Sequence, residues 1–96
     1  IFVEDNFGNH VCVCISDRYN SQIGENVLDR YAVDYVAILD IDRGKASLRS
    51  LSYPVNSIAE ALGGGGHKLA AGFEMPGHEL IHRFIKKPRR IKGVER

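Results

Sequence analysis

The chain has 96 residues, which is enough for one small domain with a single hydrophobic core. Apolar residues make up 44%, charged residues 26%, and the net charge is +1, a balance typical of a globular soluble domain and unlike that of a disordered chain. No apolar run approaches the roughly 20 residues that a membrane-spanning helix needs, and the first residues do not resemble a signal peptide, so we expect a cytoplasmic protein with no membrane partner.

The first half of the chain predicts a strand, a helix and a hairpin. Residues 10–16 are apolar on both alternating faces, which is typical of a strand covered on both sides. Ser21 can cap an amphipathic helix that runs to residues 32–34. Residues 35–41 predict a second buried strand, and a tight turn then leads into an alternating strand over residues 45–51, so these two strands are expected to form a hairpin.

The second half predicts two further helices on either side of a glycine-rich segment. Residues 55–62 predict a short helix with one apolar side. After the glycines, residues 68–71 can form one or two helical turns and residues 72–75 a short strand. The last helix spans residues 79–86 and ends before Pro88, because the residue preceding a proline disfavours helical geometry.

The order of these elements, β-α-β-β-α-β-α, predicts one small α/β domain. We expect a mixed sheet of about four to five strands with helices packed on its faces. Residues 1–8 are interpreted as a linker or N-terminal extension, residues 9–87 as the domain, and residues 88–96 as a basic C-terminal tail that frays.

Charge is distributed unevenly along the chain. Residues 81–96 hold seven basic side chains and one acidic one, a balance of +6, so the remainder of the chain carries −5. A basic tail on an acidic body can attract a polyanion, or it can simply keep the protein in solution. The sequence leaves both roles open.

Cys12 and Cys14 point to the same face of the first predicted strand. Their Cα atoms would lie ~6.6 Å apart, near the upper limit for a disulfide, and strand geometry does not aim the two sulfurs at each other. A zinc site would need further ligands, and His10 nearby does not complete a zinc-finger spacing. We therefore expect two reduced thiols in the core.

The segment 63–72 reads Gly-Gly-Gly-Gly-His-Lys-Leu-Ala-Ala-Gly and is the most informative part of the chain. Four glycines allow positive φ and let another molecule approach the backbone amides, which suits a phosphate. His67 adds a donor that is neutral or cationic near pH 7. A flexible linker is the alternative, but patterned apolar sequence flanks the run on both sides and serine is absent from it.

Ser47 and Arg49 share one face of the third predicted strand, because side chains alternate along a strand. An arginine can bind a phosphate or carboxylate through two parallel hydrogen bonds. An exposed strand face with a solvated charge is the alternative. The glycine segment follows after one short helix that can return the chain to the same edge, which favours an oxyanion site.

Four features together resemble the DHH-associated C-terminal domain of the Asp-His-His phosphoesterases. They are Ser-Leu-Arg-Ser at 47–50, Ile58-Ala59 on a helix, the glycines and His67, and Ala-Ala-Gly at 70–72. The resemblance covers roughly residues 9–75. The family includes RecJ-like exonucleases, oligoribonucleases that degrade very short RNAs, and phosphatases acting on adenosine bisphosphate or cyclic dinucleotides.

The resemblance implies that this chain binds substrate. Arg49 would contact a phosphate or terminal nucleotide, His67 a phosphate or base, and Ser47 with Ser50 would orient the ligand. The amides of three glycines would contact phosphate oxygens; these are Gly64, Gly65 and Gly66. The expected ligands are short single-stranded RNA or DNA, or a nucleotide phosphate.

In that family the catalytic metals, usually manganese, are bound by Asp and His motifs of a separate N-terminal domain. This chain contains no Asp-His-His triplet, and Asp40 and Asp42 stand at a turn where a solvated role is expected. We therefore expect no catalytic residue, metal or cofactor in this chain and an Asp-His-His catalytic domain as its partner. A single-stranded nucleic-acid-binding module without catalysis is the alternative function. A third context is the C-terminal region of alanyl-tRNA synthetase-like proteins.

Overall fold

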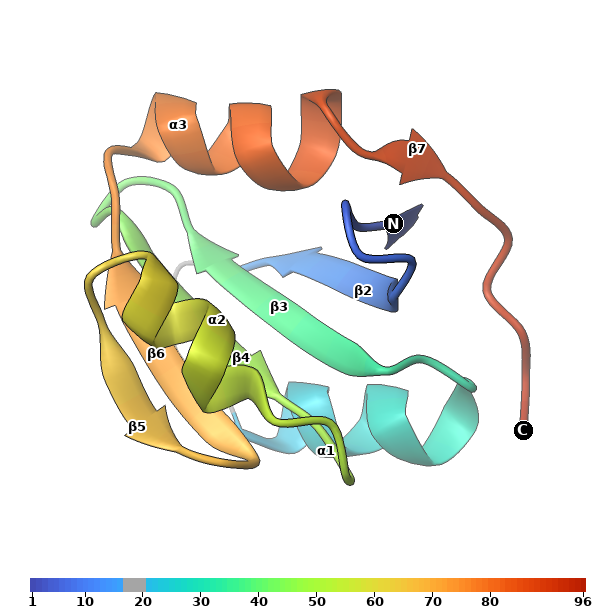
Figure 1. Ribbon diagram of the computed structural model, residues 1–96. Helices are drawn as coiled ribbons and strands as arrows, with labels where there is room; N and C mark the ends of the chain where they lie inside the picture. The colour runs from blue at the N-terminus through green and yellow to red at the C-terminus, as the bar shows by residue number, and fades with distance from the viewer. Residues whose placement is uncertain (17–20) are drawn as a thin grey trace.

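The computed structural model describes residues 1–16 and 21–96, and of Ser21 it describes the backbone alone, so the expected helix cap lies outside the described residues. Within these residues one sheet contains seven strands in the order β5-β6-β4-β3-β2-β1-β7, and only β2 and β3 are parallel (Figure 1). The elements are, in chain order, β1 (Phe2–Glu4), β2 (His10–Ile15), α1 (Ser21–Arg30), β3 (Tyr35–Asp40), β4 (Lys45–Arg49), α2 (Val55–Ala61), β5 (Gly65–His67), β6 (Ala70–Glu74), α3 (Gly77–Ile81), a π-helical turn η1 (His82–Lys86) and β7 (Arg89–Arg90).

Helices cover the two faces of the sheet unequally. On one face, α2, α3 and η1 pack against β3, β4 and β6 and bury the larger part of the core, with Leu39, Leu48 and Leu80 fully buried (Figure 1). On the other face, α1 alone packs on the middle of the sheet, where its Leu28 meets Val36 of β3. Among the described residues, no helix has the length and apolar character that crossing a bilayer requires.

The α/β class and the mixed sheet are confirmed, and the predicted hairpin is present as β3 and β4, with Val36 opposite Arg49 and Asp40 opposite Lys45. The expected count of four to five strands is too low. The additional strands are the short segments β1, β5 and β7, which are held by backbone pairing at or near the sheet edges. Two or three residues carry no detectable alternation, so hydrophobic periodicity cannot find them.

The prediction of helical turns at residues 68–71 is wrong. The chain instead forms a β-hairpin in which His67 pairs with Ala70 and residues 68–69 make the turn. Ala70 and Ala71 favour helices in isolation, but pairing of this segment with β4 outweighs that preference. The hairpin places the glycine run and Arg49 on the same sheet.

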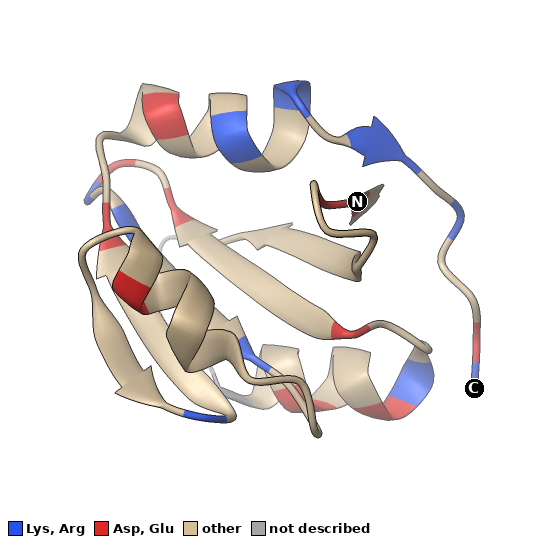
Figure 2. Ribbon diagram, viewed as in Figure 1, with Lys and Arg blue, Asp and Glu red and all other residues tan. Residues whose placement is uncertain are grey.

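The ends of the chain lie against the body. β1 and β7 pair at one end of the sheet, and the Arg89 guanidinium lies 2.9 Å from the Glu4 carboxylate. Beyond β7, the Ala32 N–H donates to the Val94 carbonyl at 2.6 Å. Residues 88–96 were expected to fray, but they pack against the rest of the domain. Figure 2 shows that basic residues follow one another along the end of the continuous helix formed by α3 and η1 and along β7.

Candidate functional site

Strand register brings four of the seven predicted site residues together, Ser47, Arg49, Gly65 and His67. His67, Ala70 and Arg49 lie opposite one another across β5, β6 and β4, and Gly65, Gly72 and Ser47 form the next row. Residues that face each other across paired strands project to the same side of the sheet. We call these two rows, six residues in all, the open face.

The open face lies on the side of the sheet that carries α1. The alternate residues of β4, Ala46 and Leu48, are buried in the core under α2, so Ser47 and Arg49 point the opposite way. Helix α1 packs mainly on β3, and every residue of the open face is half-buried or exposed. A ligand can therefore approach these strands directly.

The floor of the open face consists largely of backbone. Two of its residues, Gly65 and Gly72, have no side chain, and Ala70, which lies between Arg49 and His67, has only a methyl group. A shallow hollow of about 730 Å³ adjoins this floor and is lined by Ser47, by residues 62–64 at the end of α2, and by strand residues 45, 46 and 72–74. Such a surface lets a phosphate come within hydrogen-bonding distance of main-chain groups.

The four consecutive glycines, residues 63–66, have different structural roles. Gly63 ends α2 with a φ of 88°. A Cβ on Gly64 would lie 2.1 Å from the Gly72 carbonyl oxygen, and one on Gly66, where φ is 141°, would lie 2.6 Å from the Ala71 Cα. Gly63 and Gly65 both have open space around the missing side chain, with nothing within 4 Å, but of the two only Gly65 has a φ that is not positive. Most of the run is thus required for the turn and for close packing of the hairpin, and Gly65 is the position that faces outward.

The amide of Gly64 is not available to a ligand, because it donates to the Ala59 carbonyl at 2.8 Å. This bond joins the end of α2 to the start of β5. Strand β5 is the last strand of the sheet, and an edge strand leaves part of its backbone donors without a strand partner. Gly65 and Gly66 are consecutive residues of β5, so one of their two amides pairs with β6 and the other points outward.

Arg49 is half-buried and held on both sides. Its Nη1 donates to the carbonyl of Leu48 at 2.8 Å, and its stem lies against Gly24 of α1, where a Cβ would sit 3.3 Å from the Arg49 Cγ. A hollow of about 360 Å³ beside it also touches Glu25 and Asp29 of α1. These carboxylates disfavour an anion on the α1 side of Arg49.

Ser50 lies off the open face. It is 7% exposed, its hydroxyl donates to the carbonyl of Tyr53, and its N–H donates to the Leu69 carbonyl at 3.1 Å. The Val55 N–H donates to the Lys68 carbonyl at 2.8 Å in the same region. Ser50 therefore fixes the β4–α2 loop against the β5–β6 turn that follows His67.

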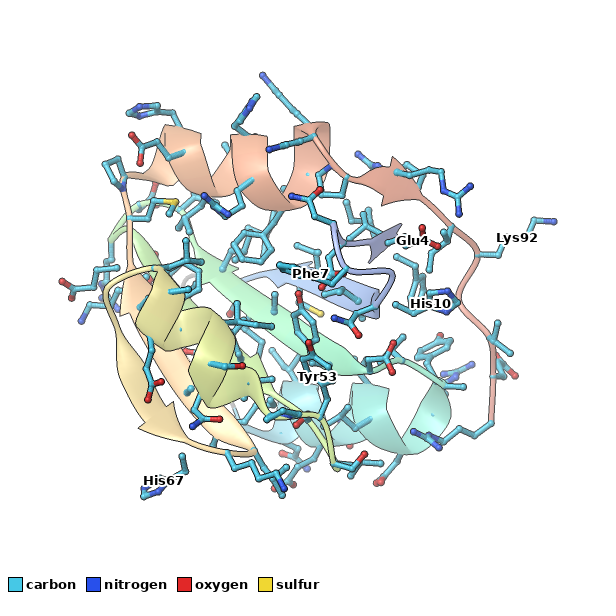
Figure 3. All side chains as sticks on the ribbon, viewed as in Figure 1. Glu4, Phe7, His10, Tyr53, His67 and Lys92 are labelled. Atoms are coloured by element: carbon cyan, nitrogen blue, oxygen red, sulfur yellow. The ribbon has the colours of Figure 1, made fainter. Side chains whose placement is uncertain are left out.

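His67 is exposed at the rim of the sheet and projects away from the body (Figure 3). It stands two strands from Arg49, which corresponds to roughly 10 Å between their Cα atoms at ordinary strand spacing. The two side chains can thus contact different parts of one nucleotide. Asp40 lies at the β3–β4 turn, where its carboxylate accepts from the Arg43 N–H at 3.1 Å and its side chain is 14% exposed, so the expected solvated role is not seen.

Sequence reasoning missed Gly24. A glycine in the middle of an amphipathic helix costs helix stability, and this cost was the available signal that something packs closely there. What packs there is the stem of Arg49. Among the described residues there is no group of three or more His, Cys, Asp or Glu side chains placed to hold a metal ion.

Comparison with known proteins gives one family. A model of the DHHA1 domain matches residues 8–91. The chain is 33% identical over 93 residues to oligoribonuclease NrnB of Bacillus subtilis, covering 92% of this chain and 23% of that protein. It is 53% identical over 61 residues to the uncharacterized protein MG371 homolog of Mycoplasma pneumoniae, covering 56% of this chain and 19% of that protein.

A solved structure of an uncharacterized protein from Helicobacter pylori G27 has the same fold. It superposes with a TM-score of 0.68 at 19% identity and covers 88% of this chain and 28% of that one. The chain therefore spans about a fifth to a quarter of the length of the curated relatives it matches.

Proposed function

This chain belongs to the DHHA1 domain family, and on that premise we propose that it is the substrate-binding domain of a metal-dependent phosphoesterase. It holds the phosphate and terminal nucleotide of short oligonucleotides or small nucleotide phosphates. The observation that carries the proposal is the open face, where register unites Ser47, Arg49 and His67 over a floor of glycine and alanine.

Each residue of the open face has a part in this proposal. Arg49 binds a phosphate through its guanidinium, which pairs with two oxygens at once. Ser47 and the outward-pointing amide of the Gly65–Gly66 segment donate to the remaining oxygens, and His67 at the rim contacts a second phosphate or a base. Gly64 and Ser50 shape the site through the hairpin and the loop, and they make no direct contact.

The chemistry belongs to another part of the protein. We infer that a longer polypeptide carries an N-terminal Asp-His-His domain that binds manganese, in keeping with the DHHA1 match and with the small share of each relative that this chain spans. Metal-assisted phosphoester cleavage needs a substrate held in line with the attacking oxygen. A second domain that binds the neighbouring nucleotide supplies that alignment. We propose that the protein acts in the cytoplasm.

The proposal extends to the class of substrate. One relative is named an oligoribonuclease, and a site that contacts phosphates carries little base information. We expect short RNAs to bind with weak sequence preference. A 5′-phosphorylated RNA of two or three nucleotides is the appropriate probe for the 96-residue chain.

Isothermal titration with that RNA tests the site. Arg49→Ala should weaken affinity about 10- to 100-fold, because a hydrogen bond to a charged group contributes roughly 1.5–3 kcal/mol. His67→Ala should weaken it about 2- to 10-fold, since a typical hydrogen bond contributes less. Arg43→Ala, on the β3–β4 turn, is the matched control and should leave affinity unchanged. Equal affinity in the wild type, Arg49→Ala and His67→Ala would refute the proposal.

A single-stranded nucleic-acid-binding module without catalysis is the second candidate, and one specific surface favours it. Phe7 is 83% exposed and lines a small cavity of about 80 Å³ together with Arg83 and Lys87 on the side of the sheet opposite the open face. Its turn is ordered, because the Asp5 carboxylate accepts from the Phe7 N–H at 2.9 Å. An aromatic ring beside cations suits a stacked base and its phosphate.

Longer single-stranded RNA separates the two functions. If the module function holds, Phe7→Ala and Lys87→Ala each weaken binding of a long strand severalfold, and Arg49→Ala has no effect. If the phosphoesterase domain function holds, Arg49→Ala dominates with short and long RNAs alike.

A further inference from the structure

Two thiols are in contact on the central strand β2, outside the proposed substrate site. Cys12 and Cys14 project from the same side of the strand, and their sulfurs are 3.9 Å apart in a hydrogen bond. Both are free thiols, as expected, but the expectation that the sulfurs are not aimed at each other is wrong. Side chains two residues apart on a strand can lean toward each other through their χ1 angles.

The two sulfurs differ in access to solvent. Cys12 is 5% exposed and lies in the core under α1 with Leu28 and Val36, whereas Cys14 is half-buried. A reagent can therefore reach Cys14 first. The buried Cys12 can then react only with the oxidised form of the Cys14 sulfur.

Contact between the thiols also favours ionisation of the outer one. The hydrogen bond from Cys12 stabilises the Cys14 thiolate and lowers the pKa of Cys14 to about 7, although partial burial opposes this shift. The same hydrogen bond and burial raise the pKa of Cys12, which stays protonated.

Among the described residues, Cys14 packs against a cluster of apolar and aromatic side chains. From α1 the neighbours in this cluster are Val27, Leu28 and the Tyr31 ring, and from β3 they are Val36 and Ile38. The contact between the two thiols therefore dominates the pH dependence of Cys14.

We propose that Cys14 and Cys12 form a dithiol redox site, in which the Cys14 thiolate reacts with a hydroperoxide and Cys12 converts the product into an intrachain disulfide. The Cys14 sulfur attacks one peroxide oxygen and the O–O bond breaks, giving a sulfenic acid and a hydroxide or alkoxide that takes up a proton. The Cys12 sulfur then displaces the sulfenic hydroxyl, and the Cys12 proton leaves with it as water. Two thiols are oxidised and one peroxide is reduced.

Strand geometry permits this disulfide and makes it reversible. Residues two apart in a strand have Cα atoms ~6.6 Å apart, just inside the range that disulfides span. β2 is paired on both sides, by β1 and β3, so the backbone cannot shorten freely to relax the bond. We expect a strained disulfide that a dithiol reductant opens readily.

Oxidation of the 96-residue chain with one equivalent of hydrogen peroxide tests the site. Mass spectrometry should find an intrachain Cys12–Cys14 disulfide that dithiothreitol reverses. Cys12→Ser should stop at a sulfenic acid on residue 14, trapped by dimedone, and Cys14→Ser should not react at residue 12. Persistent sulfenic acid in the wild type, or first reaction at Cys12, would overturn the proposal.

The pH dependence of alkylation is a second measurement and needs no oxidant. Iodoacetamide labelling of Cys14 should have a midpoint near pH 7 in the wild type and near the ordinary thiol value of about 8.5 in Cys12→Ala. Thermal unfolding of the variant confirms that it is folded under the labelling conditions. The same midpoint in both proteins would show that Cys12 does not lower the pKa of Cys14.

Discussion

Two neighbouring glycines of the hairpin should respond in opposite ways to the same substitution. In Gly64→Ala the new methyl group would lie 2.1 Å from the Gly72 carbonyl oxygen and 2.6 Å from the Cβ of Phe73. The carbonyl cannot move freely, because Gly72 belongs to β6 and pairs with Ser47 of β4. In Gly65→Ala the methyl group meets nothing within 4 Å, and Gly65 does not have a positive φ.

The magnitudes follow from these distances. Overpacking against fixed neighbours costs about 1–3 kcal/mol, so Gly64→Ala should lower the melting temperature by roughly 8–16 °C for a cost near 2 kcal/mol in a domain of this size. Gly65→Ala should be neutral or stabilise by about 0.4–1 kcal/mol, because it reduces the entropy of the unfolded chain.

Circular dichroism melts of both variants make the comparison, and titration with 5′-phosphorylated RNA adds a second reading. The methyl group added by Gly65→Ala projects onto the open face in the row of Ser47 and Gly72, so this variant should bind RNA more weakly while the fold is retained. A large loss of stability in Gly65→Ala, or none in Gly64→Ala, would refute this division of labour among the glycines.

Three further substitutions probe the core, the helix under Arg49 and the alkaline limit of stability. Leu48→Ala removes a fully buried side chain from the centre of β4 and should lower the free energy of unfolding in urea by about 2–5 kcal/mol, whereas a loss below about 1 kcal/mol would contradict its place in the core. Gly24→Ala should improve the propensity of α1 by about 0.5–1 kcal/mol yet weaken RNA binding, because its methyl group meets the Arg49 stem at 3.3 Å; unchanged affinity would count against the support that α1 gives Arg49. Burial, followed by the Asp5 carboxylate that accepts its hydroxyl at 2.9 Å, raises the pKa of Tyr35 above its ordinary value of 10, so the stability this group contributes is complete below pH 10 and is lost as pH rises through the folded pKa. Urea unfolding at about pH 8 and pH 11 should therefore show a smaller alkaline loss in Tyr35→Phe than in the wild type, and equal losses would be inconsistent with the shift.

The apolar strands and the second helix could be predicted because their burial leaves a pattern in the sequence. β2 and β3 are covered on both faces and read as continuous apolar runs, and Val55 and Ala59 of α2 fall one helical turn apart. The segments β1 and β7 have no such pattern. They form strands because their backbones pair with each other at the edge of the sheet that the rest of the chain forms.

The candidate site was predictable residue by residue but not in its arrangement. Strand alternation alone places Ser47 and Arg49 on one face. That His67 joins them depends on the register of β5, β6 and β4, which is set by tertiary pairing that no local window contains. Ser50 was grouped with Ser47 and Arg49 as a neighbour in the motif, yet β4 ends at Arg49 and the loop beyond it turns the Ser50 hydroxyl to Tyr53.

The glycine run shows the same limit from another side. Its composition indicates that something approaches closely, and that inference holds at Gly64 and Gly66, but there the close neighbours are the Gly72 carbonyl and Ala71 of the protein itself. Composition cannot tell an internal neighbour from a ligand. Only the structure shows that Gly65 of the edge strand β5 has open space where its side chain would be, whereas Gly66 of the same strand does not.

Chemical-shift mapping by NMR tests the central claim most directly, because it locates the ligand without relying on any variant. The isotope-labelled 96-residue chain is titrated with a 5′-phosphorylated dinucleotide, and the backbone amides and the Arg49 guanidinium are followed. The largest shifts should fall on the open face, at Arg49, Gly65, Gly66 and Gly72. Shifts confined to Phe7, η1 and β7, with the open face unchanged, would contradict substrate binding at this site.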